Sequence, residues 1–311
     1  MRQRNLVLMA VALVTLALGS CQSKPSTPAH FAVGTYNLRY ANHGDSVEGN
    51  GWGQRCPVIA QLIRYHGFDI FGTQEGLIGQ LTDLEAALPG YKYIGVGRDD
   101  GKEAGEHSAI FYRTDEFELM DQGNFWLSET PDVPSKGWDA VLPRICTWGH
   151  FKYKPTGLEF LFFNLHMDHI GKQARVESAF LVQKKMVELG KDLPAILTGD
   201  FNVDQTSSSY QALVSKGVLV DAYEKADIRY VTNGTFNGYH TDGFTTSRID
   251  HIFLSPSFHV LKYGVLTDAY WTPAPSEEKA ELKDAPNEIN AEKYVKRVPS
   301  DHYPVRVVIS D

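Results

Sequence analysis

Side chains that can bind a metal ion or a phosphate stand at the ends of apolar runs in six parts of the chain. Each is a carboxylate, a carboxamide or an imidazole: Asn37, Glu75, His166, Asp200 with Asn202, Asp250, and Asp301 with His302. Oxygen ligands with few carboxylates suit a hard cation such as Mg²⁺, which keeps several waters and binds phosphate oxygens. The sequence contains no HExxH or CxxC pattern that would indicate zinc. These residues predict phosphate chemistry assisted by Mg²⁺, with Mn²⁺ as the alternative cation.

The apolar runs beside these residues are typical of buried strands. Strands are expected at residues 31–40, 69–74, 91–96, 108–113, 117–127, 144–153, 158–164, 194–198, 249–254, 258–267 and 303–309. Helices are expected from Pro57 to Gly67, at 77–88 and at 172–190. Residues 271–299 are rich in Glu, Lys and Pro and show no clear strand, so we expect a long functional or mobile loop there.

The order of these elements favours an α/β sandwich in which two central β-sheets are covered by helices on the outside. No change in composition divides the chain after residue 30, so residues 31–311 are interpreted as one domain. Side chains at the ends of neighbouring buried strands converge at one edge of a sheet and form a rigid site. We therefore expect the six parts to meet in one pocket.

Composition and charge exclude several classes of protein. The 311 residues are 42% hydrophobic and 22% charged, which excludes a disordered chain, a fibrous protein and a polytopic membrane protein. The formal net charge is -8. Without the first twenty residues, which carry Arg2 and Arg4, 28 basic residues face 38 acidic ones, a net charge of -10. So acidic a body argues against duplex nucleic acid as a partner.

The first twenty residues have the pattern of a secretory signal. Arg2 and Arg4 precede an apolar run at 6–18, which is too short to span a membrane. The string Leu-Gly-Ser-Cys at 18–21 resembles a bacterial lipobox, which implies that Cys21 is lipidated; an ordinary signal with an incidental Cys is the alternative. Residues 22–30 then form a flexible tether, and the domain is expected in the cell envelope, bound to the membrane only through the lipid.

Two cysteines remain after Cys21. A disulfide between Cys56 and Cys146 would suit an oxidising compartment and is one alternative. We favour two unpaired thiols in the core, because Cys56 lies at an expected helix start and Cys146 in a strand pattern.

The six parts together resemble a known set of motifs. In chain order they read Asn37, Gln74-Glu75, Asn164-Leu165-His166, Gly199-Asp200-Phe201-Asn202, Arg248-Ile249-Asp250-His251 and Ser300-Asp301-His302. This order is similar to that of the endonuclease/exonuclease/phosphatase superfamily. Within it, the motifs most resemble those of the deadenylase-like branch. The resemblance covers residues 31–311. It implies a four-layered α/β sandwich, with two central mixed sheets flanked by helices, and Mg²⁺-dependent hydrolysis of a phosphate ester.

The resemblance also implies metal ligands. Glu75 would be the principal ligand, and Asn37 would support the metal and the phosphate. Asp250 would bind a second metal or position its neighbours.

The resemblance implies catalytic roles as well. Asp200 would orient or deprotonate the attacking water, and Asn202 would donate to the scissile phosphate. His166 would contact a phosphate oxygen or assist the leaving group. His302, held by Asp301, would be the base or would stabilise the transition state, and which of Asp200 and His302 takes the proton is left open.

Further residues are candidates for contact with the substrate. Each also has a structural explanation, such as a solvated hairpin, an ion pair or loop packing: Arg98, Glu106, His107, Trp138, Arg144 and His169. Specificity is expected in the 98–108 turn, the 129–143 loop and the 271–299 insertion, because loops on a rigid scaffold carry recognition.

Several functions fit this reading. The favoured one is a monomeric Mg²⁺-dependent phosphodiesterase or phosphatase for a small or single-stranded phosphoester. The alternatives are a 3′–5′ exonuclease on single strands, a sphingomyelinase-like phosphodiesterase and an inactive ligand-binding lipoprotein. A glycoside hydrolase using Glu75 and Asp200 is disfavoured, because it leaves Asn202, Asp250 and His302 without a role.

Overall fold

The computed structural model describes residues 30–190, 192–274, 280, 282–286, 288, 289 and 291–310. The expected signal peptide, Cys21 and the tether up to residue 29 lie outside the described residues. Within the described part, no helix has the length and apolarity needed to cross a membrane.

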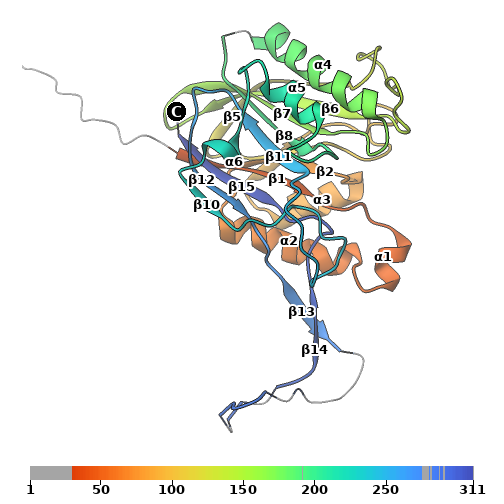
Figure 1. The fold of residues 1–311 in the computed structure, drawn as a ribbon, viewed down its shortest axis with the longest axis vertical. Coiled ribbons are helices and arrows are strands. Elements are labelled where there is room, and N and C mark those ends of the chain that lie inside the picture. Colours follow the sequence, from red (N-terminus) through yellow and green to blue (C-terminus); the bar gives the residue numbers. More distant parts are fainter. Residues whose placement is uncertain are drawn as a thin grey trace, which may run out of the picture.

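Most of the expected strands and helices are present (Figure 1). The strands are β1 (His30–Asn37), β2 (Ile70–Gln74), β3 (Tyr91–Ile94), β4 (Ile110–Arg113), β5 (Phe117–Trp126), β6 (Ile145–Tyr153), β7 (Leu158–His166), β8 (Ala195–Asp200), β9 (Val220–Asp221), β10 (Ile228–Tyr230), β11 (Asp250–Leu254), β12 (His259–Val265), β13 (Tyr270–Pro273), β14 (Tyr294–Arg297) and β15 (Val305–Ser310). The helices are α1 (His43–Val47), α2 (Trp52–His66), α3 (Ile78–Ala87), α4 (Lys172–Gly190), α5 (Ser208–Val214) and α6 (Ala222–Lys225). The short elements α1, α5, α6, β9 and β10 were not expected.

Two mixed sheets form the centre of the molecule. One has seven strands in the order β10-β12-β15-β1-β2-β4-β3, and the other has six in the order β5-β6-β7-β8-β11-β9. Both sheets are mostly antiparallel. The first contains two parallel pairs, β1 with β2 and β10 with β12, and the second contains one, β7 with β8. Helices α2 and α3 cover the first sheet, and α4 and α5 cover the second (Figure 1). The predicted four-layered α/β sandwich is confirmed.

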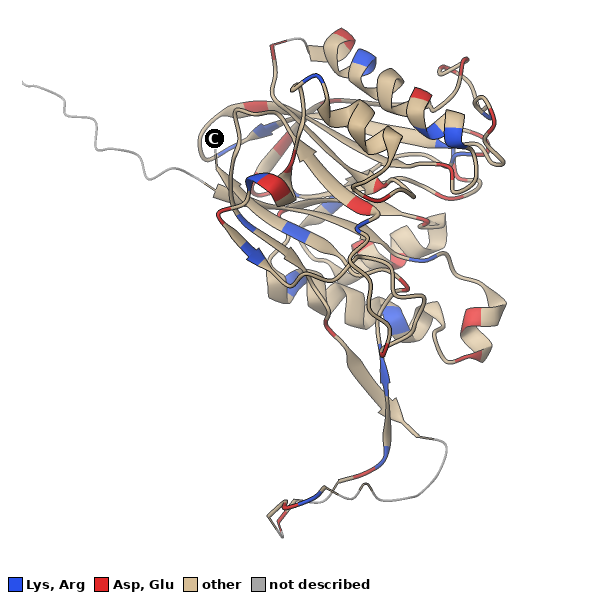
Figure 2. Cartoon of the chain, viewed as in Figure 1, with Lys and Arg blue, Asp and Glu red and all other residues tan. Residues whose placement is uncertain are grey.

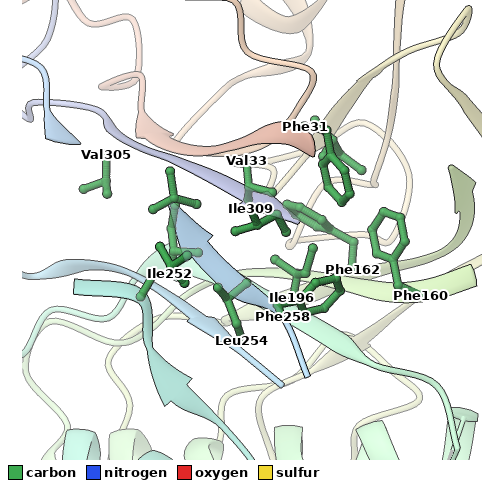
Figure 3. Close-up of a cluster of buried hydrophobic side chains, with 14 of the residues drawn as sticks. Phe31, Val33, Phe160, Phe162, Ile196, Ile252, Leu254, Phe258, Val305 and Ile309 are labelled. Carbon is green, nitrogen blue, oxygen red and sulfur yellow. The ribbon is translucent and has the colours of Figure 1, made fainter. Parts of the chain in front are cut away.

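The largest core cluster lies between the two sheets (Figure 3). Phe31 and Val33 of β1 meet Phe162 of β7 and Ile196 of β8 there. Because successive side chains of a strand point to opposite faces, the alternate residue Tyr36 packs against the helices instead. Asn37 has the same parity as Val33 and therefore points inward, toward the other sheet.

Helix α2 begins earlier than expected. It starts at Trp52 rather than at Pro57, so Pro57 lies inside the helix. Pro57 has no N–H for the carbonyl of Gly53. Both residues are exposed, so water can bond that carbonyl, and the helix continues to Gly67, whose φ of 62° ends it in the left-handed conformation.

Residues 271–299 contain two strands, so the expectation of a strandless loop was wrong. Strands β13 and β14 pair antiparallel from Tyr270↔Arg297 to Pro273↔Tyr294 and project from the body (Figure 1). Both are largely exposed, and they therefore lack the apolar run by which a buried strand is recognised. Arg297 anchors the base of this arm through the Glu48 carbonyl and Asn50 Oδ1.

The two described cysteines are free. Cys56 and Cys146 are both buried and unpaired, which confirms the preference for two core thiols. Burial raises the pKa of the Cys56 thiol to about 11, so it remains protonated at neutral pH.

Candidate active site

Strand register aligns three of the candidate residues. His166 at the end of β7 pairs with Asp200 at the end of β8, and Asp200 pairs with Asp250 at the start of β11. On each strand the residue lies an even number of positions from a side chain of the inter-sheet core, namely Phe162, Ile196 and Ile252. All three therefore point into the space between the sheets, toward Asn37 on β1.

A layer of buried polar side chains separates the apolar core from this row. Gln74 Nε2 donates to Thr35 Oγ1 at 3.0 Å and to Asn164 Oδ1 at 2.7 Å. The same Asn164 oxygen accepts from Thr198 Oγ1 at 3.0 Å. Gly72 leaves room for this layer, since a Cβ there would lie 2.1 Å from Asn164 Oδ1. The network joins β1, β2, β7 and β8 and fixes their ends relative to one another.

Asn37 links two carboxylates of the site. Its Nδ2 donates to Glu75 Oε1 at 3.1 Å and to Asp200 Oδ2 at 3.0 Å. The second oxygen of Glu75 accepts from the backbone N–H of Tyr40 at 3.1 Å. Glu75 is half-buried, so its carboxylate is both oriented and accessible.

His302 is held by Asp250 and not by Asp301. His302 Nδ1 donates to Asp250 Oδ2 at 2.8 Å, and His302 Nε2 lies 3.8 Å from Asp200 Oδ2. Asp301 instead pairs with Arg39 at 3.5 Å. The expectation that Asp301 holds His302 was wrong, because the adjacent residues point different ways and the partner comes from β11.

Charge and burial set the protonation of this group. Burial alone would lower the pKa of His302, but the charges of Asp250 and Asp200 outweigh it and raise the pKa to about 10. Burial and the charge of Asp250 raise the pKa of the Asp200 carboxyl to about 7. At neutral pH His302 is therefore an imidazolium, and Asp200 is the carboxylate that can exchange a proton.

His166 is kept neutral. Burial lowers its pKa well below the usual range, and the charge of Arg144 adds to that effect. Asn202 Nδ2 donates to His166 Nε2 at 3.1 Å and to the Met167 carbonyl at 2.9 Å. His166 Nδ1 then carries the proton, and it has no hydrogen-bond partner among the described residues.

The candidate residues surround one pocket of about 460 Å³. Its lining comprises Arg39, Tyr40, Glu75, Glu106, Leu142, Arg144, His166, His169, Asp200, Asn202, Phe236, Asp301 and His302. Asn37 and Asp250 lie just behind the wall and bond residues that face the pocket. The two sides of the sandwich thus contribute to a single site.

Three residues of the lining have a left-handed backbone. The φ angles are 56° at Arg39, 63° at Glu75 and 51° at Asn202. Each such conformation costs about 1–3 kcal/mol in a residue other than glycine. Side chains hold two of these turns, since Asn37 Oδ1 accepts from Arg39 N–H and Asp200 Oδ1 from Asn202 N–H. Strain concentrated at one pocket is typical of a functional site.

Three of the six expected substrate contacts line this pocket: Glu106, Arg144 and His169. Arg98 and His107 do not line it; they border a smaller void behind Glu106 and Arg144. Trp138 lines neither space, and its backbone N–H donates to Glu129.

Arg144 is a buried cation with one nitrogen that makes no hydrogen bond among the described residues. Its Nε lies 3.3 Å from Asp168 Oδ2, and its Nη2 donates to His169 Nδ1 at 3.0 Å. Nη1 has no partner among the described residues. A buried guanidinium with an unused N–H at a pocket wall suits a phosphate oxygen.

Sequence reasoning missed four residues of the lining: Arg39, Tyr40, Leu142 and Phe236. Arg39 and Tyr40 lie two and three residues after Asn37, so their closeness to the motif was an available signal. Phe236 packs edge-on against His302, with ring centroids 5.1 Å apart, and nothing local in the sequence indicates it.

Sequence reasoning also missed Arg55, which does not line the pocket but supports the segments that do. It is fully buried in α2 and donates to four backbone carbonyls, those of Leu38, Arg39, Asn50 and Pro299. It thereby joins the loop after β1 to the segment before Asp301. An Arg four residues before Ile59, on the apolar face of the helix, was the signal that could have found it.

The donor set fits a divalent cation. Asp200, Asp250 and His302 place possible ligand atoms within 4.8 Å of one another, but Asp250 and His302 already bond each other. Glu75 and Asp301 both face the pocket and are better placed. Burial raises the pKa of the Asp301 carboxyl, and the nearby charge of Glu75 adds to it. A cation between two such carboxylates would relieve that repulsion.

A four-layered sandwich whose strand ends carry these groups defines a class of phosphoester-hydrolysing proteins. A model of the Endonuclease/Exonuclease/phosphatase family matches residues 34–302. The chain belongs to the endonuclease/exonuclease/phosphatase family. Members are hydrolases that act on phosphate esters, and the family is metal-dependent.

Two solved structures from Bacteroides thetaiotaomicron are similar over nearly the whole chain. An endonuclease/exonuclease/phosphatase family protein is 66% identical, with a TM-score of 0.83 over 91% of this chain and 95% of that one. A mannosyl-6-phosphatase of strain VPI-5482 is also 66% identical, with a TM-score of 0.82 over 90% and 100%.

The curated relatives are more distant. Two uncharacterised proteins of Acanthamoeba polyphaga mimivirus are 30% identical over 160 residues and 21% identical over 265 residues. They correspond to 49% and 75% of this chain, and the chain spans only 60% and 38% of their lengths.

Proposed function

We propose that this protein is a divalent-cation-dependent phosphomonoesterase that removes phosphate from a sugar phosphate, with the 6-phosphate of a mannosyl residue as the leading substrate. The meeting of Glu75, Asp200, Asn202 and His302 in one pocket carries the proposal. The similarity to a mannosyl-6-phosphatase supports the sugar. A pocket of about 460 Å³ also suits a small ligand better than a duplex.

We propose Mg²⁺ as the cation, with Mn²⁺ as the alternative. Glu75 and Asp301 would hold it, beside the side chain of Asn37. When bound, it would neutralise charge on the phosphate oxygens and lower the pKa of a water. A hard cation suits this set of carboxylate and carboxamide ligands.

The protein's own residues supply positioning and proton transfer. Asp200 accepts the proton of the attacking water, because His302 lies between two carboxylates and is already protonated. The water oxygen forms the new bond to phosphorus, and the bond from phosphorus to the sugar oxygen breaks. Arg144 and the His302 imidazolium stabilise the charge on phosphorus-bound oxygens. Asn202 donates its two amide hydrogens to His166 and to the Met167 carbonyl, so its part is to orient His166. His166, which carries a proton on Nδ1, lies within the same pocket to donate to an oxygen.

Release of inorganic phosphate from mannose 6-phosphate tests the proposal. We expect turnover with Mg²⁺, none with EDTA, and recovery when Mg²⁺ is restored. Glu75→Gln is expected to raise the Mg²⁺ concentration needed for half-maximal activity. Glu48→Gln, the same substitution at an exposed residue outside the pocket lining, is the matched control. Turnover that survives EDTA would refute the cation, and a substrate panel without any hydrolysed phosphomonoester would refute the activity.

A 3′–5′ exonuclease on single strands is the second candidate. Tyr40 and Phe236 line the pocket and are 37% and 49% exposed, so their rings could stack on a base. Degradation of a short single-stranded oligonucleotide, with little release of phosphate from sugar phosphates, would favour this candidate. The retained site residues argue against an inactive binding protein, and the sphingomyelinase alternative has no specific support.

We also propose that the protein is a monomer anchored in the cell envelope through a lipid on Cys21. The support is the signal and lipobox pattern of residues 1–21. Radiolabelled fatty acid should enter the wild-type protein but not Cys21→Ser, and the variant should lose its membrane association. Labelling of both proteins would contradict the anchor.

A further inference from the structure

Glu106 is fixed in the pocket by a short hairpin that belongs to none of the strands. Arg98 N–H donates to the Glu106 carbonyl at 3.1 Å, and Asp99 N–H donates to the Ala104 carbonyl at 3.1 Å. The next residue, His107, donates its N–H to the Gly76 carbonyl at 2.9 Å. Gly76 directly follows Glu75, so the hairpin holds Glu106 at a set distance from the proposed cation ligand.

Only one of the two oxygens of the Glu106 carboxylate accepts a hydrogen bond from the described residues. Its Oε2 accepts from Arg98 Nη1 at 2.6 Å and lies 3.7 Å from His166 Nδ1. The Arg98 backbone is itself held by Trp126, whose Nε1 donates to the Arg98 carbonyl at 2.7 Å. Among the described residues no hydrogen bond reaches Glu106 Oε1. The side chain is 17% exposed and lines the pocket, which leaves an acceptor available to a ligand.

The chemistry of this acceptor excludes the phosphate as its partner. A carboxylate repels phosphate oxygens and can bond only to hydrogen-bond donors. The hydroxyl groups of a sugar are donors of the required kind, and a phosphomonoester of a simple phenol has none next to its phosphate.

We infer that Glu106, oriented by Arg98, accepts hydrogen bonds from hydroxyl groups of the sugar and so determines specificity for a polyhydroxylated phosphate ester. The inference rests on the proposed function and deepens it. It assigns Glu106 a role in choosing the substrate and leaves the attack on phosphorus to Asp200 and His302.

The test compares two phosphomonoesters in the full chain with Mg²⁺. Mannose 6-phosphate offers hydroxyl donors, and 4-nitrophenyl phosphate does not. Glu106→Gln is expected to lower kcat/KM for mannose 6-phosphate about 10- to 100-fold more than for the nitrophenyl ester, because the charged acceptor is lost and one of its two oxygens becomes an NH2 donor. Glu103→Gln removes the same charge from the exposed tip of the hairpin and is expected to leave the ratio unchanged.

Deoxy analogues of mannose 6-phosphate identify the hydroxyl. The analogue that lacks it should be a poorer substrate for the wild-type protein by about the same factor, and Glu106→Gln should add little further loss with that analogue. Hydrolysis of the nitrophenyl ester by the variant shows that it is folded.

Two outcomes overturn the inference alone. An equal loss on both esters would mean that Glu106 acts through His166, and an unchanged ratio would mean that it does not touch the sugar. If the wild-type protein hydrolyses the nitrophenyl ester but no sugar phosphate, the proposed substrate is wrong and the inference falls with it.

Discussion

At the residue scale, the partners of His302 decide its role. Asp250 accepts from its Nδ1, and the charges of Asp250 and Asp200 raise its pKa to about 10, so the protonated ring has no lone pair with which to accept a proton. The task of base passes to Asp200. The adjacent Asp301, which the motif suggested as the partner, is free to face Glu75 and a cation.

Asp250→Asn tests this division of roles. The substitution removes the charge that keeps His302 protonated, so we expect kcat to fall roughly 100- to 10,000-fold while the Mg²⁺ requirement stays the same. Steady-state kinetics across a Mg²⁺ titration measures both quantities. Asp301→Asn is the comparison, and it is expected to raise the Mg²⁺ requirement. The reverse pattern would show that Asp301 serves His302 and Asp250 the cation.

At the element scale, the site depends on how closely the ends of β1, β2, β7 and β8 approach one another. Gly72 on β2 permits that approach, because Asn164 and Thr198 occupy the space of its missing side chain. The polar layer can therefore bond across both sheets directly beneath Asn37 and Asp200.

Gly72→Ala is expected to lower the free energy of unfolding by about 1–3 kcal/mol, because the new methyl group displaces Asn164. It should also lower kcat, since the strand ends shift. Gly79→Ala on α3 is the matched control: a Cβ there meets nothing within 4 Å. The free energy of unfolding of the control should rise by up to about 1 kcal/mol, because Ala has a better helix propensity than Gly. Urea unfolding measures both, and a Gly72→Ala protein as stable as the wild type would contradict the prediction.

The carboxylate of Asp168 stabilises the loop after β7. Burial acts to raise the pKa of Asp168, but hydrogen bonds from the N–H groups of Gly171 and Ile170 and the charge of Arg144 lower it overall. The folded pKa thus lies below the unfolded value of about 3.9, so the folded protein binds fewer protons than the unfolded chain. The contribution of ionised Asp168 to the free energy of unfolding is therefore present above about pH 4 and is lost as the pH falls through the folded pKa.

Asp168→Asn should therefore be less stable than the wild type at pH 6, and the difference should shrink toward pH 3. Urea unfolding at several pH values measures it. Asp132→Asn, an exposed substitution in the preceding loop, is the control and should show no such convergence. A difference that grows as the pH falls would contradict the sign.

At the scale of the whole molecule, charge limits the partners. The net charge is -8, and Figure 2 shows Lys and Arg interspersed with Asp and Glu along the described ribbon. A duplex offers a regular array of phosphates that only clustered cations can neutralise. The arginines that line the pocket, Arg39 and Arg144, each pair with a carboxylate, Asp45 and Asp168, which offsets their charge.

We expect no binding to a duplex DNA probe at about 0.15 M salt and about 10 µM protein, because sequence-independent affinity comes from phosphate contacts. Fluorescence anisotropy of a labelled duplex measures this, and a basic DNA-binding protein is the positive control. Saturable binding that weakens steeply with salt would contradict the prediction and would favour a nuclease function.

The sequence alone determined the class of protein and most of the scaffold. Helix α4 has the expected bounds, and the strands that carry Asn37, His166 and Asp200 lie where apolar runs end in polar residues. These features depend on neighbours in the chain, so local periodicity and motif order reveal them. Exposed strands such as β13 have no such pattern and were missed.

Only the tertiary structure decided which groups meet. The bond between His302 and Asp250 joins residues 52 positions apart, and that between Asn37 and Asp200 spans 163 positions. Phe236 at the pocket and Arg55 beneath it likewise depend on segments brought together by packing. The physical reason is that a side chain's partners follow from strand register and from the packing of one sheet on the other, which local spacing does not encode.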